Sequence, residues 1–337
     1  MTLQPIDPAD DSRIQHCKAE LNGKTYHYLL GLPHGDFRAT IFLIHGWPDL
    51  SMTWRNQIPL FLQMGLRVVC PDIMGFGGTD APPVPPESIS YYSFKRAASD
   101  IKELARQLGA SRIILGGHDW GGAIVYRVAL WYPEFVTHLF AVGTPYLAPS
   151  KDLEPLEELV KTKLPNFGYQ LQLASGDVEK VITSRDQLRQ FLNALYGGKG
   201  PNGEVGFTIQ EGLLVQNLPK LGPSPVISEK YLNYYTDQYA RNGIHSTLNW
   251  YRTREVNFEE ELELKKTIID IPVLFIFATK DAVLPRAMSA GMEQYMPDLT
   301  RKEVTASHWA LWEKPEEVNG LIQEWLEGVA LSGKSTL

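Results

Sequence analysis

The chain has 337 residues, 44% of them hydrophobic and 21% charged, which is enough apolar material for one large core or for a core with an insertion. Its net charge is −7, with basic residues scattered along the sequence, which excludes the concentrated positive charge of a nucleic-acid-binding surface. The two cysteines, Cys17 and Cys70, cannot form a disulfide framework, so we expect a reducing, cytoplasmic environment.

The ends of the sequence carry no clear targeting signal. Residues 1–5, followed by acidic residues, lack the basic and apolar regions of a signal peptide, and no apolar run reaches membrane-spanning length. Residues 335–337, Ser-Thr-Leu, resemble a peroxisomal tripeptide faintly but lack its basic middle residue, so we interpret them as a frayed tail. No His or Cys spacing predicts a metal site.

Short apolar runs alternate with helical patterns along most of the chain. Several runs are apolar on both faces, which is typical of buried, mostly parallel strands. The clearest helical pattern spans residues 94–108, and another spans 315–331. This alternation predicts a doubly wound sheet that binds ligands at the carboxyl ends of its strands. The predicted strands cover residues 26–32, 40–44, 66–70, 112–115, 136–142, 272–278 and 302–304.

The alternation stops between about residues 149 and 264. This stretch is rich in Leu, Tyr, Gln and Asn at helical spacing, has no strand pattern and is too long for a simple connection. We therefore predict a helical lid inserted into the core domain. The predicted segments are residues 1–148 for the first part of the core, 149–264 for the lid and 265–337 for the second part of the core.

Residues 116–122 read Gly-Gly-His-Asp-Trp-Gly-Gly, between a predicted strand and a predicted helix. This pattern is typical of the sharp turn that exposes the nucleophile of an α/β-hydrolase, and Asp119 occupies the nucleophile position. A serine that attacked an sp3 carbon would leave an ether that activated water cannot open, whereas a carboxylate leaves an ester that water can hydrolyse. Asp119 therefore predicts epoxide or alkyl halide substrates. The alternative interpretation is a helix-capping Asp in a Gly-rich turn.

An acid and a base follow in the chain order of the α/β-hydrolases. Asp281 comes after the predicted strand 272–278, and His308 comes after the predicted strand 302–304, so both lie at carboxyl ends of strands. We predict that His308 is the general base that deprotonates water and that Asp281 orients it.

Hydrolysis of an ester also needs donors for a developing oxyanion. The predicted donors are the backbone N–H groups of Trp120, which follows the nucleophile, and of Trp47, in the sequence His-Gly-Trp-Pro at residues 45–48. The alternative for residues 45–48 is a tight turn with no direct role, and the two interpretations are compatible because such a turn aims the amide.

Together these motifs resemble the soluble epoxide hydrolases of the α/β-hydrolase superfamily, over about residues 24–327. The resemblance implies an α/β-hydrolase fold, a cis peptide bond before Pro48 and two lid tyrosines that donate hydrogen bonds to the epoxide oxygen. The motifs that carry it are His45-Gly46-Trp47-Pro48, Gly117-His118-Asp119-Trp120-Gly121-Gly122, Asp281 and His308-Trp309.

Two segments resemble the tyrosine-bearing parts of that lid. Residues 167–171, Phe-Gly-Tyr-Gln-Leu, resemble the first, and residues 248–252, Leu-Asn-Trp-Tyr-Arg, resemble the second. The resemblance assigns Tyr169 and Tyr251 as the donors, and acidic O–H groups suit this task because ring opening leaves an alkoxide. The other lid tyrosines are expected to pack.

Haloalkane dehalogenases have the same kind of turn as residues 116–122. Other residues must therefore decide between epoxide hydrolysis and dehalogenation. Dehalogenases often carry Asn directly after the His-Gly pair, where this chain has Trp47, and fluoroacetate dehalogenases carry a basic residue after the nucleophile, where it has Trp120. Both differences favour epoxides. The residues expected to line a mostly hydrophobic substrate site are Trp47, Trp120, Phe167, Trp250 and Trp309.

The sequence thus predicts an epoxide hydrolase that forms vicinal diols through an ester on Asp119, without a cofactor. Its expected partners are a small hydrophobic epoxide and water. A haloalkane dehalogenase and a non-catalytic small-molecule-binding homologue stay as alternatives. The sequence leaves open the natural epoxide, the regio- and enantioselectivity, a detoxification or lipid-mediator role, and the oligomeric state, a homodimer included.

Overall fold

The structure is a computed structural model that describes residues 3–331, so the tripeptide 335–337 lies outside the described residues. The described chain forms two compact units. The first unit comprises residues 3–73, 94–149 and 260–331, and the second comprises residues 74–93 and 150–259.

Residues 74–93 mark a difference from the sequence-based segments, which placed them in the core. In the structure they group with the second unit. The Trp250 indole N–H donates to the carbonyl of Met74, and the Ser246 hydroxyl donates to the carbonyl of Gly75. These long-range bonds have no local sequence pattern that could have predicted them.

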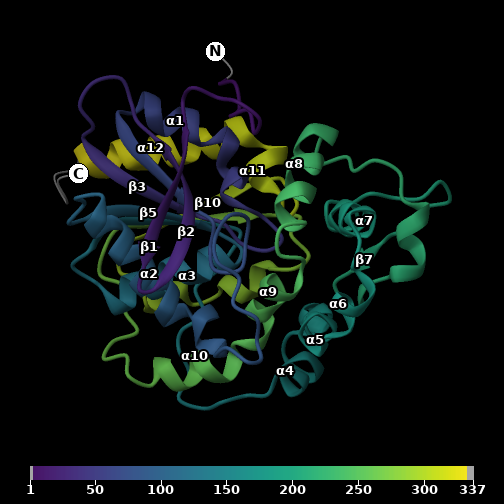
Figure 1. The fold of residues 1–337 in the computed structure, drawn as a ribbon. Coiled ribbons are helices and arrows are strands. Elements are labelled where there is room, and N and C mark those ends of the chain that lie inside the picture. The colour runs from purple at the N-terminus through teal and green to yellow at the C-terminus, as the bar shows by residue number, and fades with distance from the viewer. Residues whose placement is uncertain (1–2, 332–337) are drawn as a thin grey trace. The chain divides into compact units, whose positions relative to one another are not determined.

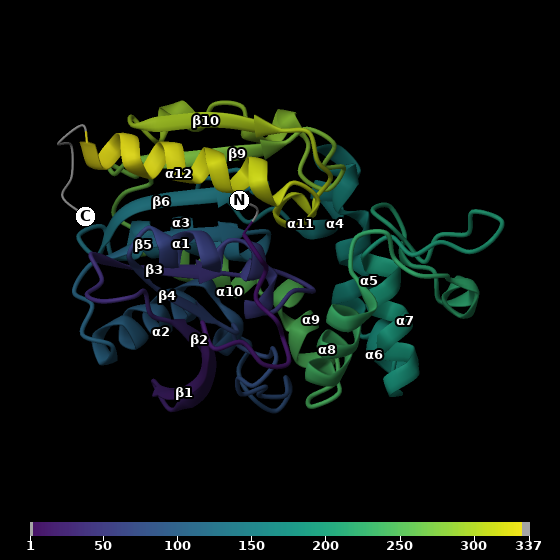
Figure 2. The ribbon, with the colours of Figure 1, turned by 90° about the horizontal axis from the view of Figure 1, so that it is seen from above.

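The first unit contains an eight-stranded sheet in the order β1-β2-β4-β3-β5-β6-β9-β10, which Figure 2 shows from β1 to β10. The pairs β1–β2 and β2–β4 are antiparallel and the other pairs are parallel. This confirms the predicted mostly parallel α/β sheet. The strands are β1 (Gln15–Leu21), β2 (Lys24–Gly31), β3 (Ala39–Ile44), β4 (Leu66–Pro71), β5 (Ile113–His118), β6 (Val136–Val142), β9 (Val273–Ala278) and β10 (Leu299–Val304).

Helices cover both faces of this sheet, with α1 and α12 above it and α2 and α3 below it in Figure 1. Every residue of β5, β6 and β9 is buried, as expected for strands that are apolar on both faces. The first unit's helices and helical turns are η1 (Ser51–Asn56), α1 (Ile58–Gln63), α2 (Phe94–Gln107), α3 (Trp120–Trp131), η6 (Arg286–Ser289), η7 (Met292–Gln294), α11 (Ala310–Glu313) and α12 (Pro315–Leu331). Helix α10 (Arg254–Glu261) crosses the boundary between the units.

Strand β1 was not predicted from the sequence. It is an edge strand that pairs with β2 alone, and most of its side chains are exposed or half-buried. Residues 17–21 do alternate, with Cys17, Ala19 and Leu21 less exposed than Lys18 and Glu20, but the small Cys and Ala side chains give this face little apolar area. Asn22 and Gly23, both at positive φ, form a two-residue turn that pairs β1 with β2, so β1 belongs to a hairpin whose Asn-Gly signal was missed in the sequence.

The second unit is mainly helical, as predicted for the lid. It also contains a short antiparallel hairpin that the sequence did not predict, in which two-residue strands pair. Strands this short have too few residues to show a periodicity. The elements are η2 (Ile89–Tyr92), α4 (Leu156–Thr162), η3 (Pro165–Phe167), α5 (Gly168–Ser175), α6 (Asp177–Val181), α7 (Arg185–Leu195), β7 (Phe207–Thr208), β8 (Gly212–Leu213), η4 (Val215–Lys220), α8 (Glu229–Tyr239), α9 (His245–Leu248) and η5 (Asn249–Arg252).

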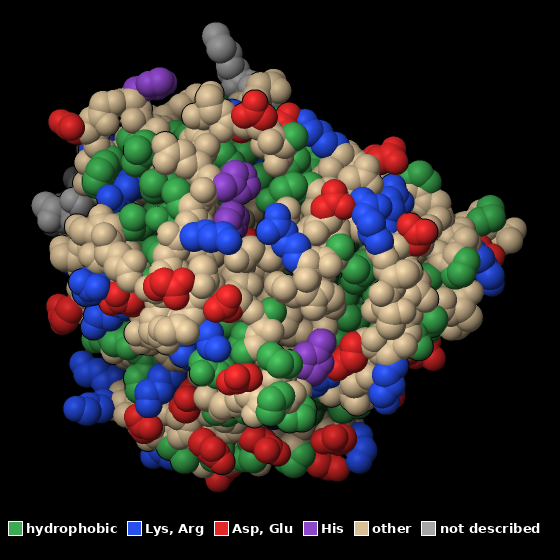
Figure 3. Space-filling view, viewed as in Figure 1, with side chains coloured by type: hydrophobic (Ala, Val, Ile, Leu, Met, Phe, Trp, Pro, Cys, Tyr) green, Lys and Arg blue, Asp and Glu red, His purple; other side chains and the backbone are tan. Residues whose placement is uncertain are grey.

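The surface bears charges of both signs. On the face in Figure 3, Lys and Arg side chains are interspersed with Asp and Glu. Among residues 3–331, no helix combines the length and the apolar character needed to cross a bilayer. Within the same described range, no group of three or more His, Cys, Asp or Glu residues is arranged to hold a metal ion.

Gly121 provides a test of the close packing between α3 and the sheet. A Cβ at this position would overlap with the carbonyl oxygen of Ile44 in β3. We expect Gly121→Ala to lower the free energy of unfolding by about 3 kcal/mol, because the backbone cannot move aside as a flexible side chain can. Urea-induced unfolding measures this change.

Gly320→Ala is the matched control, because a Cβ at Gly320 in the exposed part of α12 meets nothing within 4 Å. We expect it to leave stability unchanged or raise it by up to about 1 kcal/mol, since alanine favours helix more than glycine does. Equal effects of the two substitutions would contradict the packing argument.

Candidate active site

Asp119 lies in a sharp turn between β5 and α3. Its backbone has φ 54° and ψ −127°, an unusual conformation for a residue other than glycine, which costs of the order of 1–3 kcal/mol. The backbone carbonyl of Asp119 accepts hydrogen bonds from the Thr144 hydroxyl at 2.9 Å and from the Ala123 N–H at 3.2 Å. The turn therefore projects one carboxylate at the carboxyl end of the central strand, as the sequence predicts.

Two backbone amides hold this carboxylate. The N–H of Trp47 donates to Oδ1 of Asp119 at 2.7 Å, and the N–H of Trp120 also donates to the carboxylate. These are the two groups that the sequence predicts as oxyanion donors. The peptide bond between Trp47 and Pro48 is cis, as the resemblance implied. A Cβ at Gly46 would overlap with the Asp119 carboxylate, so only glycine fits there.

His45 supports the loop that carries Trp47. Its ring is fully buried, its Nδ1 bonds the carbonyl of Gly46 at 2.8 Å, and its Nε2 bonds the N–H of Ile73 at 3.0 Å. Since a carbonyl accepts and an amide N–H donates, Nδ1 carries the proton and the ring is neutral. Burial lowers the pKa of His45, which agrees with this assignment. The sequence pattern around His45 predicted a tight turn but no separate role for its side chain.

Asp281 and His308 form the second charged pair. Oδ2 of Asp281 lies 2.8 Å from Nδ1 of His308. Oδ1 accepts the backbone N–H groups of Val283 at 2.8 Å and Leu284 at 3.1 Å, which fixes the carboxylate at the end of β9. Burial raises the pKa of Asp281, but the His308 charge, its hydrogen bond and these two amides together bring it below the usual value. Asp281 therefore stays charged beside the imidazole.

The other ring nitrogen of His308 faces Asp119. Nε2 lies 3.6 Å from Oδ2 of Asp119, slightly beyond hydrogen-bond distance. Burial lowers the pKa of His308, but the Asp281 carboxylate and then Asp119 outweigh this and raise it to about 9. Burial raises the pKa of Asp119, and the His308 charge and the two amides oppose that rise. The imidazole is thus placed between two carboxylates.

His118 is a supporting residue to which the sequence analysis assigned no role. It precedes the nucleophile, is 1% exposed, and its Nε2 lies 2.8 Å from the backbone carbonyl of His308. Burial, followed by the nearby His308, lowers the pKa of His118 to about 3, so the ring is neutral and donates to that carbonyl from Nε2. Strand β5 and the loop that carries His308 are therefore joined directly.

The aromatic residues predicted near the nucleophile pack around these groups. The ring of Trp309 lies edge-on to His308 at 5.0 Å and stacks on Trp312 at 5.5 Å. Trp120 lies 6.0 Å from Phe94 in a tilted arrangement. Trp309 thus provides apolar surface beside the His308 imidazole.

Tyr169 and Tyr251 lie together in the second unit. Tyr169 is on α5 and Tyr251 is on η5, their ring centroids are 5.9 Å apart, and the rings are nearly perpendicular. Each tyrosine is 6% exposed. Phe167 contacts Tyr169 edge-on at 6.5 Å. The two segments that the sequence selected are thus adjacent, although about 80 residues separate them.

Trp250 packs inside the second unit. Its side chain is 1% exposed, its indole N–H donates to the carbonyl of Met74 at 2.9 Å, and its ring lies edge-on to Tyr92 at 6.4 Å. These contacts anchor η5, which carries Tyr251. Substrate contact by Trp250 stays a prediction.

Comparisons with known proteins agree with this geometry. The sequence model described as alpha/beta hydrolase fold matches residues 39–315. The chain is 42% identical to "Epoxide hydrolase srdG" of Neurospora crassa, over 96% of this chain and 98% of that protein.

The chain belongs to the epoxide hydrolase family.

Further members of this family show the same relation. The "Bifunctional epoxide hydrolase 2" of Sus scrofa is 32% identical over 85% of this chain, which matches 51% of that longer protein. The crystal structure of Epoxide Hydrolase A from Mycobacterium thermoresistibile has a TM-score of 0.76 and 26% identity, over 94% of this chain and 98% of that one. In this epoxide hydrolase family member, the Asp119, Asp281 and His308 cluster therefore lies on the family's own fold.

The position of His308 between two carboxylates predicts how its titration responds to a substitution. Asp119→Asn removes a negative charge near the imidazolium, so the charged form loses stabilisation and the pKa of His308 falls below its value of about 9. NMR titration of ring-labelled histidine measures this midpoint. A midpoint that does not change would contradict the electrostatic pairing.

Proposed function

We propose that the protein hydrolyses epoxides to vicinal diols through a covalent ester on Asp119. The observation that carries this proposal is the placement of His308 Nε2 opposite a carboxylate whose other oxygen accepts the Trp47 amide. A serine in this place would suit acyl transfer, whereas a carboxylate suits attack on an sp3 carbon. The family membership supports epoxides as the electrophile.

In the first half of the reaction, Oδ2 of Asp119 attacks one ring carbon in line with the breaking C–O bond. The bonding electrons move to the ring oxygen, which takes a proton from a tyrosine hydroxyl. Tyr169 and Tyr251 are the proposed donors, supported by their adjacency in the second unit. The product of this half is a β-hydroxyalkyl ester of Asp119.

In the second half, His308 takes a proton from water, and the resulting hydroxide attacks the ester carbonyl carbon of Asp119. The N–H groups of Trp47 and Trp120 stabilise the oxyanion that develops there. Collapse of the intermediate releases the diol, whose newly freed oxygen receives the proton held by His308. The remaining proton of the attacking water leaves the Asp119 carboxyl and passes through solvent to the tyrosinate formed in the first half, which restores the resting protein. Asp281 stabilises the imidazolium during this step.

The aromatic surroundings of Asp119 favour a mostly hydrophobic epoxide. We propose Trp47, Trp120, Phe167, Trp250 and Trp309 as the substrate-binding side chains, of which Trp309 already packs on the general base. The cytoplasm is the proposed compartment, from the cysteine content.

The covalent ester leads to a specific labelling prediction. In a single turnover in water enriched in heavy oxygen, the label enters the Asp119 carboxylate and is absent from the first diol formed, because labelled water attacks the ester carbonyl. Mass spectrometry of the protein and the diol measures both. Label found at once in the diol, with an unlabelled protein, would contradict the proposal.

Two variants provide controls for this experiment. Asp119→Asn is expected to abolish diol formation, and His308→Gln is expected to accumulate the ester as a stable adduct, since water is no longer activated. Styrene oxide and a bromoalkane offered to the wild-type protein separate the alternatives. Halide release without diol formation would indicate a dehalogenase, and neither reaction would indicate a binding protein.

The tyrosine roles predict an effect on ring opening alone. Replacing both Tyr169 and Tyr251 by Phe removes the acidic O–H donors, and we expect ester formation to fall by at least about 10²-fold. Rapid-quench mass spectrometry of the adduct in the His308→Gln background measures this rate. Ester formation at an unchanged rate would exclude both residues as donors.

A further inference from the structure

We propose that Arg252 is a positioning residue that fixes the separation of Tyr169 and Tyr251, so that both hydroxyls reach the same epoxide oxygen. The inference rests on the proposed function of the two tyrosines. Arg252 directly follows Tyr251 in η5, and its side chain is 19% exposed.

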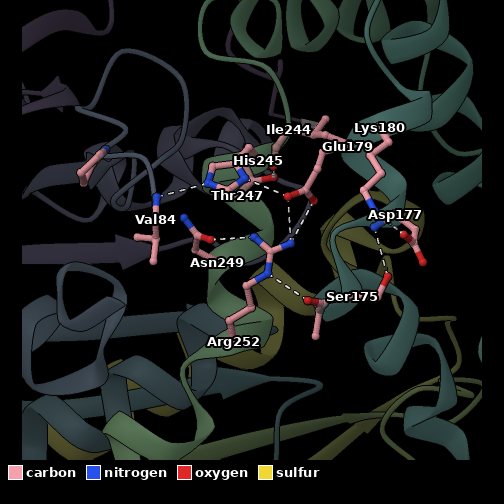
Figure 4. A network of polar contacts seen from close by, with 12 residues as sticks. Val84, Ser175, Asp177, Glu179, Lys180, Ile244, His245, Thr247, Asn249 and Arg252 are labelled. Atoms are coloured by element: carbon pink, nitrogen blue, oxygen red, sulfur yellow. Dashed lines mark hydrogen bonds and ion pairs between the residues drawn. The ribbon is translucent and has the colours of Figure 1, made fainter. Parts of the chain in front are cut away.

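The Arg252 guanidinium uses all three of its nitrogens. Nε donates to the carbonyl of Ala174 at 3.0 Å, and Nη1 donates to Oδ1 of Asn249 at 2.8 Å. Nη2 donates to both carboxylate oxygens of Glu179, each at 2.9 Å. Figure 4 shows this group at the centre of the polar network. A planar fork with this many fixed acceptors cannot rotate without breaking several bonds.

The acceptors lie on the elements that carry the tyrosines. Ala174 is in α5, the helix that begins with Gly168 and Tyr169, and Asn249 is in η5 together with Tyr251. A single rigid group therefore connects the two short elements. Because neither α5 nor η5 is long enough to be stable alone, such a connection sets their spacing.

Glu179, the third acceptor, is itself held in place. Nδ1 of His245 lies 2.8 Å from Oε1 of Glu179, and the N–H of Val84 donates to Nε2 of His245 at 3.2 Å. Since Nε2 accepts, Nδ1 carries the proton and donates to Glu179. The carboxylate is thus fixed by both Arg252 and His245, which adds α6 and α9 to the same network.

Ring opening should be sensitive to this arrangement. Donors act on a developing alkoxide only at hydrogen-bond distance, and a displacement of about 1 Å can cost about 10²-fold in rate. Trp250 anchors η5 through Met74, and Arg252 anchors it through α5. Tyr251 therefore lies between two anchored neighbours in the sequence.

The test measures the two halves of the reaction separately. We expect Arg252→Met, which keeps an unbranched apolar stem, to slow ester formation from styrene oxide by about 10–100-fold, with ester hydrolysis unchanged within about twofold. Rapid-quench mass spectrometry gives the first rate in the His308→Gln background, and single-turnover decay of the ester gives the second. Ester formation within about twofold of the parent, or equal slowing of both steps, would overturn the proposal.

Arg254→Met is the matched control. Arg254 lies two residues further on, is exposed, and its Nε donates to the carbonyl of Glu154 instead. We expect this variant to keep the parent rate of ester formation. A fall equal to that of Arg252→Met would show that any lost arginine in this segment is harmful, which would overturn the specific role.

A double-mutant cycle separates positioning from general stability. If Arg252 acts through the tyrosine pair, Arg252→Met should slow ester formation much less in the Tyr251→Phe background than in the parent, because one positioned donor is already absent. Strictly additive effects would overturn the proposal.

Arg252→Lys keeps the positive charge beside Glu179 but lacks the planar guanidinium that donates to Ala174, Asn249 and Glu179 together. It serves as the second variant if Arg252→Met does not fold. We expect ester formation in Arg252→Lys to stay at least about fivefold below the parent, and full recovery would overturn the geometric argument. If the His308→Gln parent forms no adduct at all, the proposed function fails. If the parent forms the adduct and Arg252 variants match it, only this inference fails.

Discussion

The structure of the candidate site depends on one constraint, a buried carboxylate held in a strained turn. Asp119 adopts a positive φ, and the chain around it has to be small or tightly turned to admit its side chain. Gly46 meets this need, since a Cβ there would overlap with the Asp119 carboxylate, and Gly121 lets the start of α3 approach the carbonyl of Ile44. The same close approach brings the Trp47 amide to the carboxylate, so the geometry of the turn and the oxyanion donors cannot vary independently.

The three charged residues, Asp119, Asp281 and His308, differ in how their surroundings stabilise their charge. In the resting protein, Asp281 and Asp119 both stabilise charge on His308 and keep its pKa high. In the proposed ester, Asp119 is no longer charged, so the imidazolium loses one of its two partners and its pKa falls. Formation of the ester would thus itself convert His308 toward the neutral base that hydrolysis needs. Asp281 stays charged because backbone amides and the imidazole support it.

The two units hold their candidate site residues in place by different kinds of contact. Around Asp119, backbone amides and buried strands fix the positions of a few charged groups. Around Tyr169 and Tyr251, short helices are connected by side-chain hydrogen bonds, chiefly those of Arg252 and Glu179. The proposed mechanism assigns ester formation and hydrolysis to Asp119 and His308 and protonation of the ring oxygen to the tyrosines, so the network around Arg252 matters for the first half of the reaction alone.

The buried strands, the mostly parallel sheet and the turn at Asp119 could be predicted without the structure, because each follows from a local pattern of apolar residues or glycines in the sequence. It also gave the order of Asp119, Asp281 and His308, which the fold brings together at the carboxyl ends of strands. The tertiary structure was needed to show that residues 74–93 group with the second unit, that His118 bonds the carbonyl of His308, and that Arg252 bonds Ala174 and Glu179. Each of these depends on a partner distant in the sequence, and a local periodicity reports burial but not the identity of such a partner.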